Sequence, residues 1–428
     1  MRIVKLDKDI KQNILNDLLK RSPNQYTQYE ETVASIIKDV KSRGDEAVFE
    51  LTNKFDKWDI NSDNVKVSEN EIKDAYEKVD PKLIDILKEA AENIRVFHEK
   101  QVKESWFTTK KDGSILGQKI TPIDSVGCYA PGGKAYYPSS VLMNIIPAKV
   151  AGVERIALAT PAVGGFVHPV TIVAADIAGA DEIYKIGGAQ AVAAFAYGTA
   201  SIKKVDKITG PGNIFVALAK KAVFGQVGID SIAGPSEILV IADETANPRY
   251  VAADLLSQAE HDELASAILL TTNEDFATKV SVEVDKFTNE LPRKEIIEKS
   301  LENYGYIIVC DNMEEVIDVA NDIASEHLEI ITKDAARVMT KIRNAGAIFI
   351  GPYSSEPLGD YFAGPNHILP TNGTAKFFSP LNVDDFTKKT SIISYSEEGL
   401  RAVHDKIEYF ATQESLTAHA NSIKVRFE

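Results

Sequence analysis

The sequence predicts an α/β protein with two doubly wound domains, and three observations support this. Short apolar segments alternate with Ala-rich helical segments between residues 131 and 236, which is the βαβ rhythm of a parallel sheet. A second set of strands and helices follows, between residues 237 and 351. A chain of 428 residues is long enough for two or more folded domains.

The N-terminal quarter has the three- and four-residue apolar spacing of helices. This spacing predicts helices over residues 33–56, divided at Gly44, and over residues 81–100. The pattern then changes to alternation around Asp112-Gly113, a dipeptide that favours a tight hairpin turn. We expect a strand-rich entry to the next domain here.

The two α/β units follow in order. Strands are expected in the first unit over 156–160, 182–187 and 204–209, with helices over 169–179, 189–198 and 213–224. In the second unit, further strands and helices are expected within residues 237–243, 249–271, 305–310, 314–331 and 345–351. We therefore predict a helical arm over 1–24, one domain formed by 25–128 and 237–380, an inserted domain over 129–236, and a tail over 381–428. So short a tail would struggle to form its own core, and we expect it to dock elsewhere, for example on another subunit.

Composition excludes several classes of protein. The formal charge of −15 and the lack of a basic stripe with aromatics make a nucleic-acid partner improbable. The charged N-terminus has no signal-peptide core and no segment approaches a membrane span, so we expect a cytoplasmic protein without a membrane partner. With only two cysteines, any metal must be held by nitrogen and oxygen ligands.

Histidines and nearby polar residues are the candidates for a metal site. Gln258 and His261 are three apart on a predicted helix and so share a face. Two imidazoles with the carboxylate of Asp360 could form an open zinc site. A solvated helix face explains His261 equally well, because no known metal-binding spacing is present.

Two further segments carry polar groups in suggestive places. Residues 351–371 hold Asp360, Asn366 and His367, and their density of Gly and Pro argues against a regular helix, although a purely structural loop is the alternative. Glu326 and His327 are neighbours, which on a helix diverge by about 100° and could act as separate bases.

Gly-rich turns open two helices of the first unit, at Gly187-Gly188 and at Gly210 and Gly212. Such turns expose backbone N–H groups to a dinucleotide phosphate in Rossmann-like domains. Neither matches G-x-G-x-x-G, since Phe215 stands at the third position of the second turn, and tight turns without a ligand are as good an explanation.

Taken together, the motifs resemble those of the histidinol dehydrogenase family. Eight blocks carry the resemblance in order along nearly the whole chain: residues 126–153, 186–199, 206–216, 233–243, 255–262, 324–330, 359–371 and 413–419. Cys128, in the first block, invites comparison with thiol-dependent aldehyde dehydrogenases. No activating neighbour is evident, so we interpret it as a small buried residue.

The resemblance implies a zinc-dependent, NAD-linked oxidation of L-histidinol to L-histidine through an aldehyde, the last stage of histidine biosynthesis. It places the zinc ligands, which also contact substrate, at Gln258, His261, Asp360 and His419. Further substrate contacts are Ser236, His327, His367 and Glu414, and the NAD contacts are Tyr129, Gln190 and Asn213. His327 is then the general base, and Glu326 is our choice for activating water.

It further implies that residues 129–236 bind NAD and that the domain of 25–128 and 237–380 binds zinc and substrate. The resemblance also implies a homodimer of two interlocked subunits, in which the tail would supply Glu414 and His419 to the partner's site. Ser354-Ser355 stands where many relatives have proline, and we expect a local loop effect only.

Two other readings stay open. A zinc hydrolase would use the same ligands with Glu326 as base, but would leave the Gly-rich turns without a task. A non-catalytic binding paralogue should lack a catalytic group, and here all are present.

Overall fold

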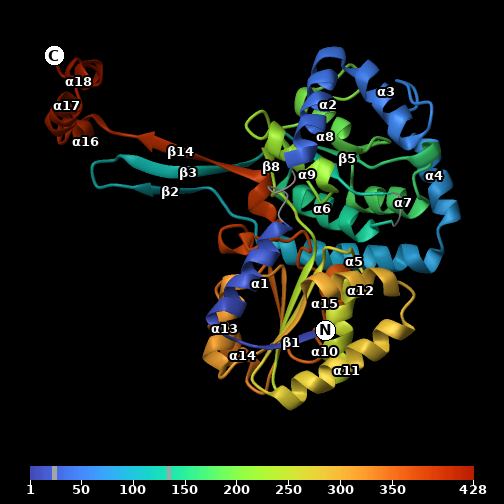
Figure 1. Ribbon diagram of the computed structural model, residues 1–428. Coiled ribbons are helices and arrows are strands. Elements are labelled where there is room, and N and C mark those ends of the chain that lie inside the picture. The colour runs from blue at the N-terminus through green and yellow to red at the C-terminus, as the bar shows by residue number, and fades with distance from the viewer. Residues whose placement is uncertain (22–26, 133–135) are drawn as a thin grey trace. The chain divides into compact units, whose positions relative to one another are not determined.

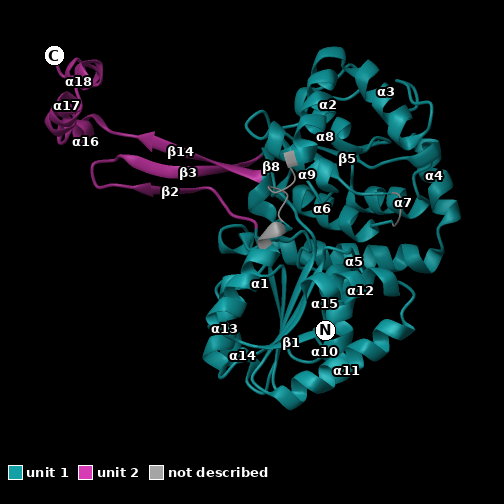
Figure 2. Ribbon diagram, viewed as in Figure 1, with its two compact units in different colours: residues 1–101, 123–386 teal, residues 102–122, 387–428 magenta. Residues whose placement is uncertain are grey.

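The computed structural model describes residues 1–21, 27–132 and 136–428, and it divides into two units (Figure 2). Unit 1 comprises residues 1–101 and 123–386, and unit 2 comprises residues 102–122 and 387–428. The predicted boundary between residues 24 and 25 lies outside the described residues, as do residues 133–135 of the first block.

Unit 1 contains a five-stranded parallel sheet in the order β6-β5-β4-β7-β8. Figure 1 labels β5 and β8 of this sheet. Consecutive strand residues pack into opposite cores: Ile156 and Leu158 face one side, and Ala157 and Ala159 the other. This double burial explains why the strands are almost wholly apolar. The strands are β4 (Ser125–Tyr129), β5 (Arg155–Ala159), β6 (Glu182–Tyr184), β7 (Lys207–Thr209) and β8 (Gly228–Ile229).

Helices cover both faces of this sheet. One face holds α4 (Glu69–Lys78), α5 (Pro81–Glu99), α6 (Pro138–Ala151) and α7 (Pro169–Ala178); the other holds α2 (Glu30–Arg43), α3 (Asp45–Asp56), α8 (Gly188–Tyr197) and α9 (Ile214–Val223). Gly44, with a positive φ of 60°, separates α2 from α3 as predicted. The grouping of 25–128 with 237–380 differs from the observed packing. The apolar faces of α2 and α5, such as Val33 and Ile94, join the cores of the five-stranded sheet.

A six-stranded parallel sheet forms the rest of unit 1, in the order β1-β11-β10-β9-β12-β13. Its strands are β1 (Arg2–Lys5), β9 (Glu237–Ala242), β10 (Ser266–Thr271), β11 (Gly305–Val309), β12 (His327–Ile331) and β13 (Ala347–Ile350). One face packs on α10 (Pro248–Ala259), α11 (Glu274–Glu290) and α12 (Lys294–Tyr304), and the other on α1 (Lys8–Lys20), α13 (Met313–Ile323) and α14 (Ala335–Met339). The arm predicted as helical thus begins with an edge strand. The α/β fold with parallel sheets is confirmed.

Unit 2 is a three-stranded antiparallel sheet followed by helices. The hairpin of β2 (Trp106–Thr109) and β3 (Ile115–Pro122) turns at Asp112-Gly113, where Gly113 has a φ of 78°. β14 (Thr387–Ser394), which the sequence did not predict, pairs along the whole of β3. The hairpin therefore completes the sheet of the tail. The helices of this unit are α16 (Glu397–Arg401), α17 (His404–Gln413) and α18 (Thr417–Lys424).

The remaining elements of unit 1 are short: α15 (Glu356–Tyr361) and the 3₁₀ turns η2 (Thr27–Tyr29), η3 (Val163–Gly165), η4 (Thr374–Lys376) and η5 (Val383–Phe386). Within the described ranges, no helix combines the length and apolarity that crossing a membrane requires.

Candidate functional site

A cavity of about 610 Å³ in unit 1 gathers most of the predicted site residues. Its wall combines the segments that precede β9 and β12 with the loops that follow β4 and β7. The predicted residues that line it are Asn213, Ser236, Gln258, His261, Glu326, His327, Asp360 and His367. The structure therefore brings together one candidate cofactor residue and all the catalytic and substrate candidates of unit 1.

Glu326 and His327 lie at the amino end of β12, and not on a helix as we expected. The helix α13 ends at Ile323, because Ala324 adopts a left-handed conformation with a φ of 52°. His327 then pairs with Ile238 in the parallel register of β9. Neighbouring side chains on a strand point to opposite sides, so the divergence of the two groups is larger than a helix would give.

The ring of His327 is held from its Nδ1 side. Nδ1 lies 3.0 Å from the carbonyl oxygen of Glu237 and 2.8 Å from Nε2 of Gln258, while Nε2 of the ring has no hydrogen-bond partner. Nδ1 can donate to this carbonyl oxygen or accept from the Gln258 amide, but not both; in the tautomer whose Nδ1–H donates to the carbonyl oxygen, Nε2 keeps a lone pair, as a general base needs. This atom is 3.7 Å from Oδ1 of Asp360.

Glu326 and His327 also shift each other's pKa. Burial raises the pKa of Glu326 to about 8, with Glu237 adding to the rise and His327 opposing it. Burial alone would lower the pKa of His327, but the carboxylates of Glu326 and Asp360 outweigh it and raise that pKa to about 10. Titratable groups displaced in this way are typical of catalytic centres.

Gln258 and His261 lie where α10 ends, which corrects the prediction that one helix carries both. The helix stops at Ala259, and a turn holds His261, whose N–H donates to the carbonyl oxygen of Gln258 at 3.1 Å. The carboxyl end of a helix carries a partial negative charge, so the acidic residues at 260, 262 and 263 would destabilise a longer helix. This explains why α10 stops at Ala259. Gln258 is buried with its Oε1 unpartnered, whereas His261 is exposed at the cavity wall.

Asp360 lies on α15, so the expectation that residues 351–371 contain no regular helix was wrong. Pro357 falls in the first turn of α15, where a missing N–H costs nothing. Ser355, from the departure noted above, precedes the helix as its N-cap residue.

His367 is fixed between Asp360 and Ser140. Its Nδ1 lies 3.0 Å from the carbonyl oxygen of Asp360, and its Nε2 lies 3.1 Å from Oγ of Ser140. Burial would raise the pKa of Asp360, but His327 and His367 lower it to about 2. Sequence reasoning missed Ser140, although it stands in the first of the eight blocks.

Two donor sets for a metal share Asp360. Among the described residues, His327, Glu356 and Asp360 place ligand atoms within 4.8 Å of one another. Glu356 was not predicted; it is buried, and burial together with Asp360 raises its pKa to about 8. The predicted set contains Gln258, whose buried Oε1 has no partner. An unpaired buried amide oxygen is costly unless a ligand satisfies it, so the donors present fit a metal.

The candidate NAD residues shape the two Gly-rich turns. The hydroxyl of Tyr129 accepts the N–H of Gly188 at 3.1 Å, and Gln190 is buried close to the same turn. Asn213 caps α9 by accepting the N–H groups of Phe215 and Val216. Of the three, Asn213 lines the cavity, whereas Tyr129 and Gln190 are buried and are not part of its lining.

The remaining candidates differ in their surroundings. Glu414, just after α17, and His419, on α18, belong to unit 2 and are exposed. Cys128 has no exposed surface, and burial raises the pKa of its thiol to about 12, which agrees with the prediction of an inert buried residue.

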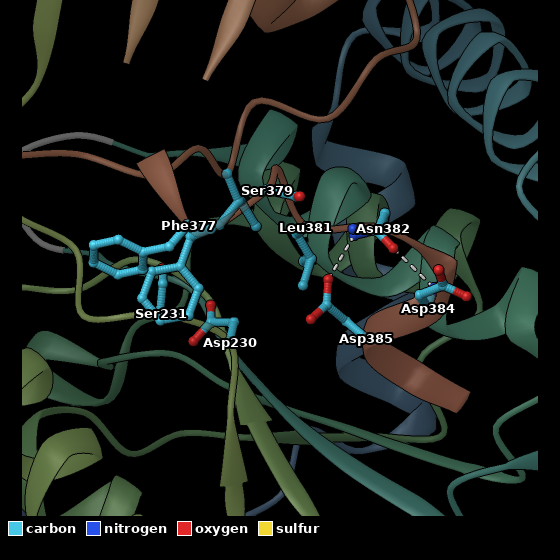
Figure 3. Close-up of a pocket in the computed structure, with 10 residues that line it drawn as sticks. Asp230, Ser231, Phe377, Ser379, Leu381, Asn382, Asp384 and Asp385 are labelled. Carbon is cyan, nitrogen blue, oxygen red and sulfur yellow. Dashed lines mark hydrogen bonds between the residues drawn. The ribbon is translucent and has the colours of Figure 1, made fainter. Parts of the chain in front are cut away.

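A second cavity, of about 260 Å³, contains none of the predicted residues (Figure 3). Its acidic groups already have partners: Asp230 pairs with Lys220, and Asp385 pairs with Lys207 and accepts the N–H of Asn382. Of these two, the cavity of about 610 Å³ is the one that holds predicted site residues.

Comparison with known proteins gives a consistent result. A family model described as histidinol dehydrogenase matches residues 19–427. Histidinol dehydrogenase from Halalkalibacterium halodurans is 56% identical over 413 residues, 96% of this chain and 97% of the relative. The Bacillus subtilis protein of that name is 56% identical over 410 residues, 95% and 96% of the two chains. A crystal structure of histidinol dehydrogenase from Elizabethkingia anophelis matches with a TM-score of 0.94 and 38% identity, covering 100% of this chain and 98% of that one.

Proposed function

The chain belongs to the histidinol dehydrogenase family, and on this premise we propose that it oxidises L-histidinol to L-histidine in two successive NAD-dependent steps. It is thus an oxidoreductase of histidine biosynthesis. The single observation that supports the mechanism best is that Nε2 of His327 has no hydrogen-bond partner and lies 3.7 Å from Oδ1 of Asp360, in the cavity that also contains Glu326 and the unpartnered Oε1 of Gln258.

Zinc would be held by Gln258, His261 and Asp360, with His419 as the fourth ligand. The donor set of amide oxygen, carboxylate and imidazole suits this metal. When bound, the ion would orient histidinol and lower the pKa of His327 by offsetting the charge of Asp360.

Nε2 of His327 would take the hydroxyl proton of the alcohol, and NAD, when bound, would supply the acceptor for the hydride of the carbon that carries this hydroxyl. Glu326 would take a proton from the water that adds to the aldehyde, while protonated His327 returns its proton to the aldehyde oxygen; this gives a gem-diol and frees Nε2 again. In the second oxidation Nε2 of His327 would take a hydroxyl proton of the gem-diol, and a second NAD, when bound, would supply the hydride acceptor. The backbone carbonyl of Glu237 keeps the imidazole oriented in both oxidations.

The Gly-rich turns supply the contacts to NAD in this proposal. Backbone N–H groups at the amino ends of α8 and α9 point toward a bound anion when such turns approach a phosphate. Asn213, at the cavity wall, is the proposed contact on the second turn. The homodimer and the cytoplasmic location stay predictions.

A stoichiometric assay tests the function. Purified protein with zinc, excess NAD and a limiting amount of L-histidinol should yield two NADH per histidinol. A yield of one would mean that the aldehyde leaves the enzyme, which contradicts the second step. No NADH, together with hydrolysis of an ester or amide substrate, would instead identify a zinc hydrolase.

A further inference from the structure

Arg21 is a buried arginine at the wall of the cavity, just beyond α1. Its guanidinium donates to the carbonyl oxygen of Leu264 at 2.9 Å and forms an ion pair with the carboxylate of Glu237. A charge is costly to bury unless it is paired and hydrogen-bonded. The ion pair therefore fixes both side chains.

Glu237 connects this ion pair to the catalytic residues. While its Oε1 contacts Arg21, its Oε2 accepts the N–H of Glu326 at 3.3 Å, and its own N–H donates to Oε2 of Glu326 at 2.9 Å. The carbonyl oxygen of Glu237 lies 3.0 Å from Nδ1 of His327. One residue thus touches both members of the pair.

We propose that Arg21 is a positioning residue for the second oxidation: through Glu237 it holds the carboxylate of Glu326 in place and offsets the negative charge beside it. The inference rests on the proposed function, since it assigns Arg21 to the step in which Glu326 activates water. It concerns a contact between residues 216 positions apart in the chain.

Electrostatics gives the expected direction of the effect. The charged groups that face Glu326 are His327 on β12, Glu237 on β9 and Asp360 on α15, and both carboxylates raise the pKa of Glu326. A cation bonded to Glu237 reduces its repulsion of a second carboxylate. Loss of that cation should raise the pKa of Glu326 further, and loss of the Glu237 charge should lower it.

The test compares zinc-loaded wild-type enzyme with Arg21→Met, Arg21→Lys and the double variant Arg21→Met/Glu237→Gln. Initial rates are measured with histidinol and with histidinal, over a range of pH. Arg21→Met should slow histidinal oxidation near pH 7 about tenfold and move the acidic limb of its profile up by about one pH unit. Arg21→Lys should restore most of the rate. The double variant should move the limb back to the wild-type position or below it.

Arg155→Met is the matched control, because Arg155 also pairs with a carboxylate, Glu182, and donates to two backbone carbonyl oxygens away from the cavity. The control should lower the rates of both oxidations equally, if at all, without moving the pH profile. The same result for Arg21→Met would overturn the proposal. The double variant leaves no unpaired buried charge, so with Arg21→Lys it keeps the test decisive if Arg21→Met fails to fold.

Glu326→Gln separates this inference from the function on which it depends. Suppose that wild-type enzyme forms two NADH per histidinol and that Glu326→Gln loses histidinal oxidation. If the Arg21 variants then change neither the ratio of the histidinal rate to the histidinol rate nor the pH dependence of either, only the role of Arg21 is wrong. If wild-type enzyme forms no NADH, both proposals fail.

Discussion

At the scale of single residues, the site depends on contacts that no local pattern in the sequence specifies. The resemblance to a known family named Glu326, His327, Gln258 and Asp360 as site residues, and all four line one cavity. Periodicity could not show that Glu237 touches both Glu326 and His327, the proposed catalytic residues, because this contact arises from the parallel register of β9 and β12. Glu356 was missed for a similar reason: its buried position depends on how α15 packs.

The first prediction concerns His327. Replacing it with Asn removes the free Nε2 and should lower turnover of histidinol by about 10² to 10⁴, the usual worth of a general base. Zinc content should stay the same, because His327 is not in the proposed ligand set. NADH formation and elemental analysis measure the two quantities, and undiminished turnover would show that another group is the base.

At the scale of the elements, one sheet lines the cavity with the carboxyl ends of its strands and the other with the amino ends. The five-stranded sheet contributes the loops after β4 and β7, on either side of the point where its strand order reverses, as is usual for parallel sheets. The six-stranded sheet contributes the amino ends of β9 and β12 instead. The strands themselves could be predicted from their apolar runs. Which ends of the strands of each sheet face the cavity could not.

The second prediction concerns the turn after β7. Gly210 has a φ of 111°, and an added Cβ would lie 2.1 Å from the carbonyl oxygen of Tyr129. Gly210→Ala should therefore distort the turn and raise the KM for NAD about tenfold or more, measured by initial rates. Gly225→Ala is the control, because Gly225 also has a positive φ but open space around it. Equal KM values for NAD in both variants would argue against a role for this turn in NAD binding.

The third prediction concerns Glu329, which is buried in the middle of β12. Burial and the carboxylate of Asp254 raise the pKa of Glu329 well above its ordinary value. The folded chain then binds more protons than the unfolded chain once the pH exceeds about 4.5, so this group costs stability increasingly as the pH rises.

Glu329→Gln keeps an oxygen that can accept the N–H of Glu356 but cannot ionise. It should raise the urea midpoint at pH 8, by an amount equivalent to ~1 kcal/mol or more, and change it little at pH 5. Exposed Glu314→Gln serves as the control. A midpoint that falls equally at both pH values would contradict a protonated Glu329.

At the scale of the whole molecule, the tail is the part that sequence reasoning described least well. β14 was not predicted, because its only two apolar residues, Ile392 and Ile393, are adjacent and so do not alternate with polar ones. Unit 2 exposes large apolar side chains, among them Phe107, Ile393 and Phe410. Such exposure favours a partner subunit, as the predicted homodimer requires.

The fourth prediction concerns shared active sites. In a heterodimer of His261→Asn and His419→Asn subunits, one site would combine the intact unit 1 of one chain with the intact tail of the other. Mixed and verified heterodimers should regain about half of the wild-type activity, measured as NADH formation, while each parent stays inactive. Inactive heterodimers would mean that His261 and His419 act within one chain.

The account depends most on which donors hold zinc, because His327 can act as a base only if the metal leaves its Nε2 free. Anomalous scattering at the zinc edge, from crystals of the zinc-loaded enzyme, measures this directly. We predict one peak per chain within bonding distance of Gln258, His261 and Asp360. A peak bounded by His327, Glu356 and Asp360 would contradict the assignment of His327 as the base.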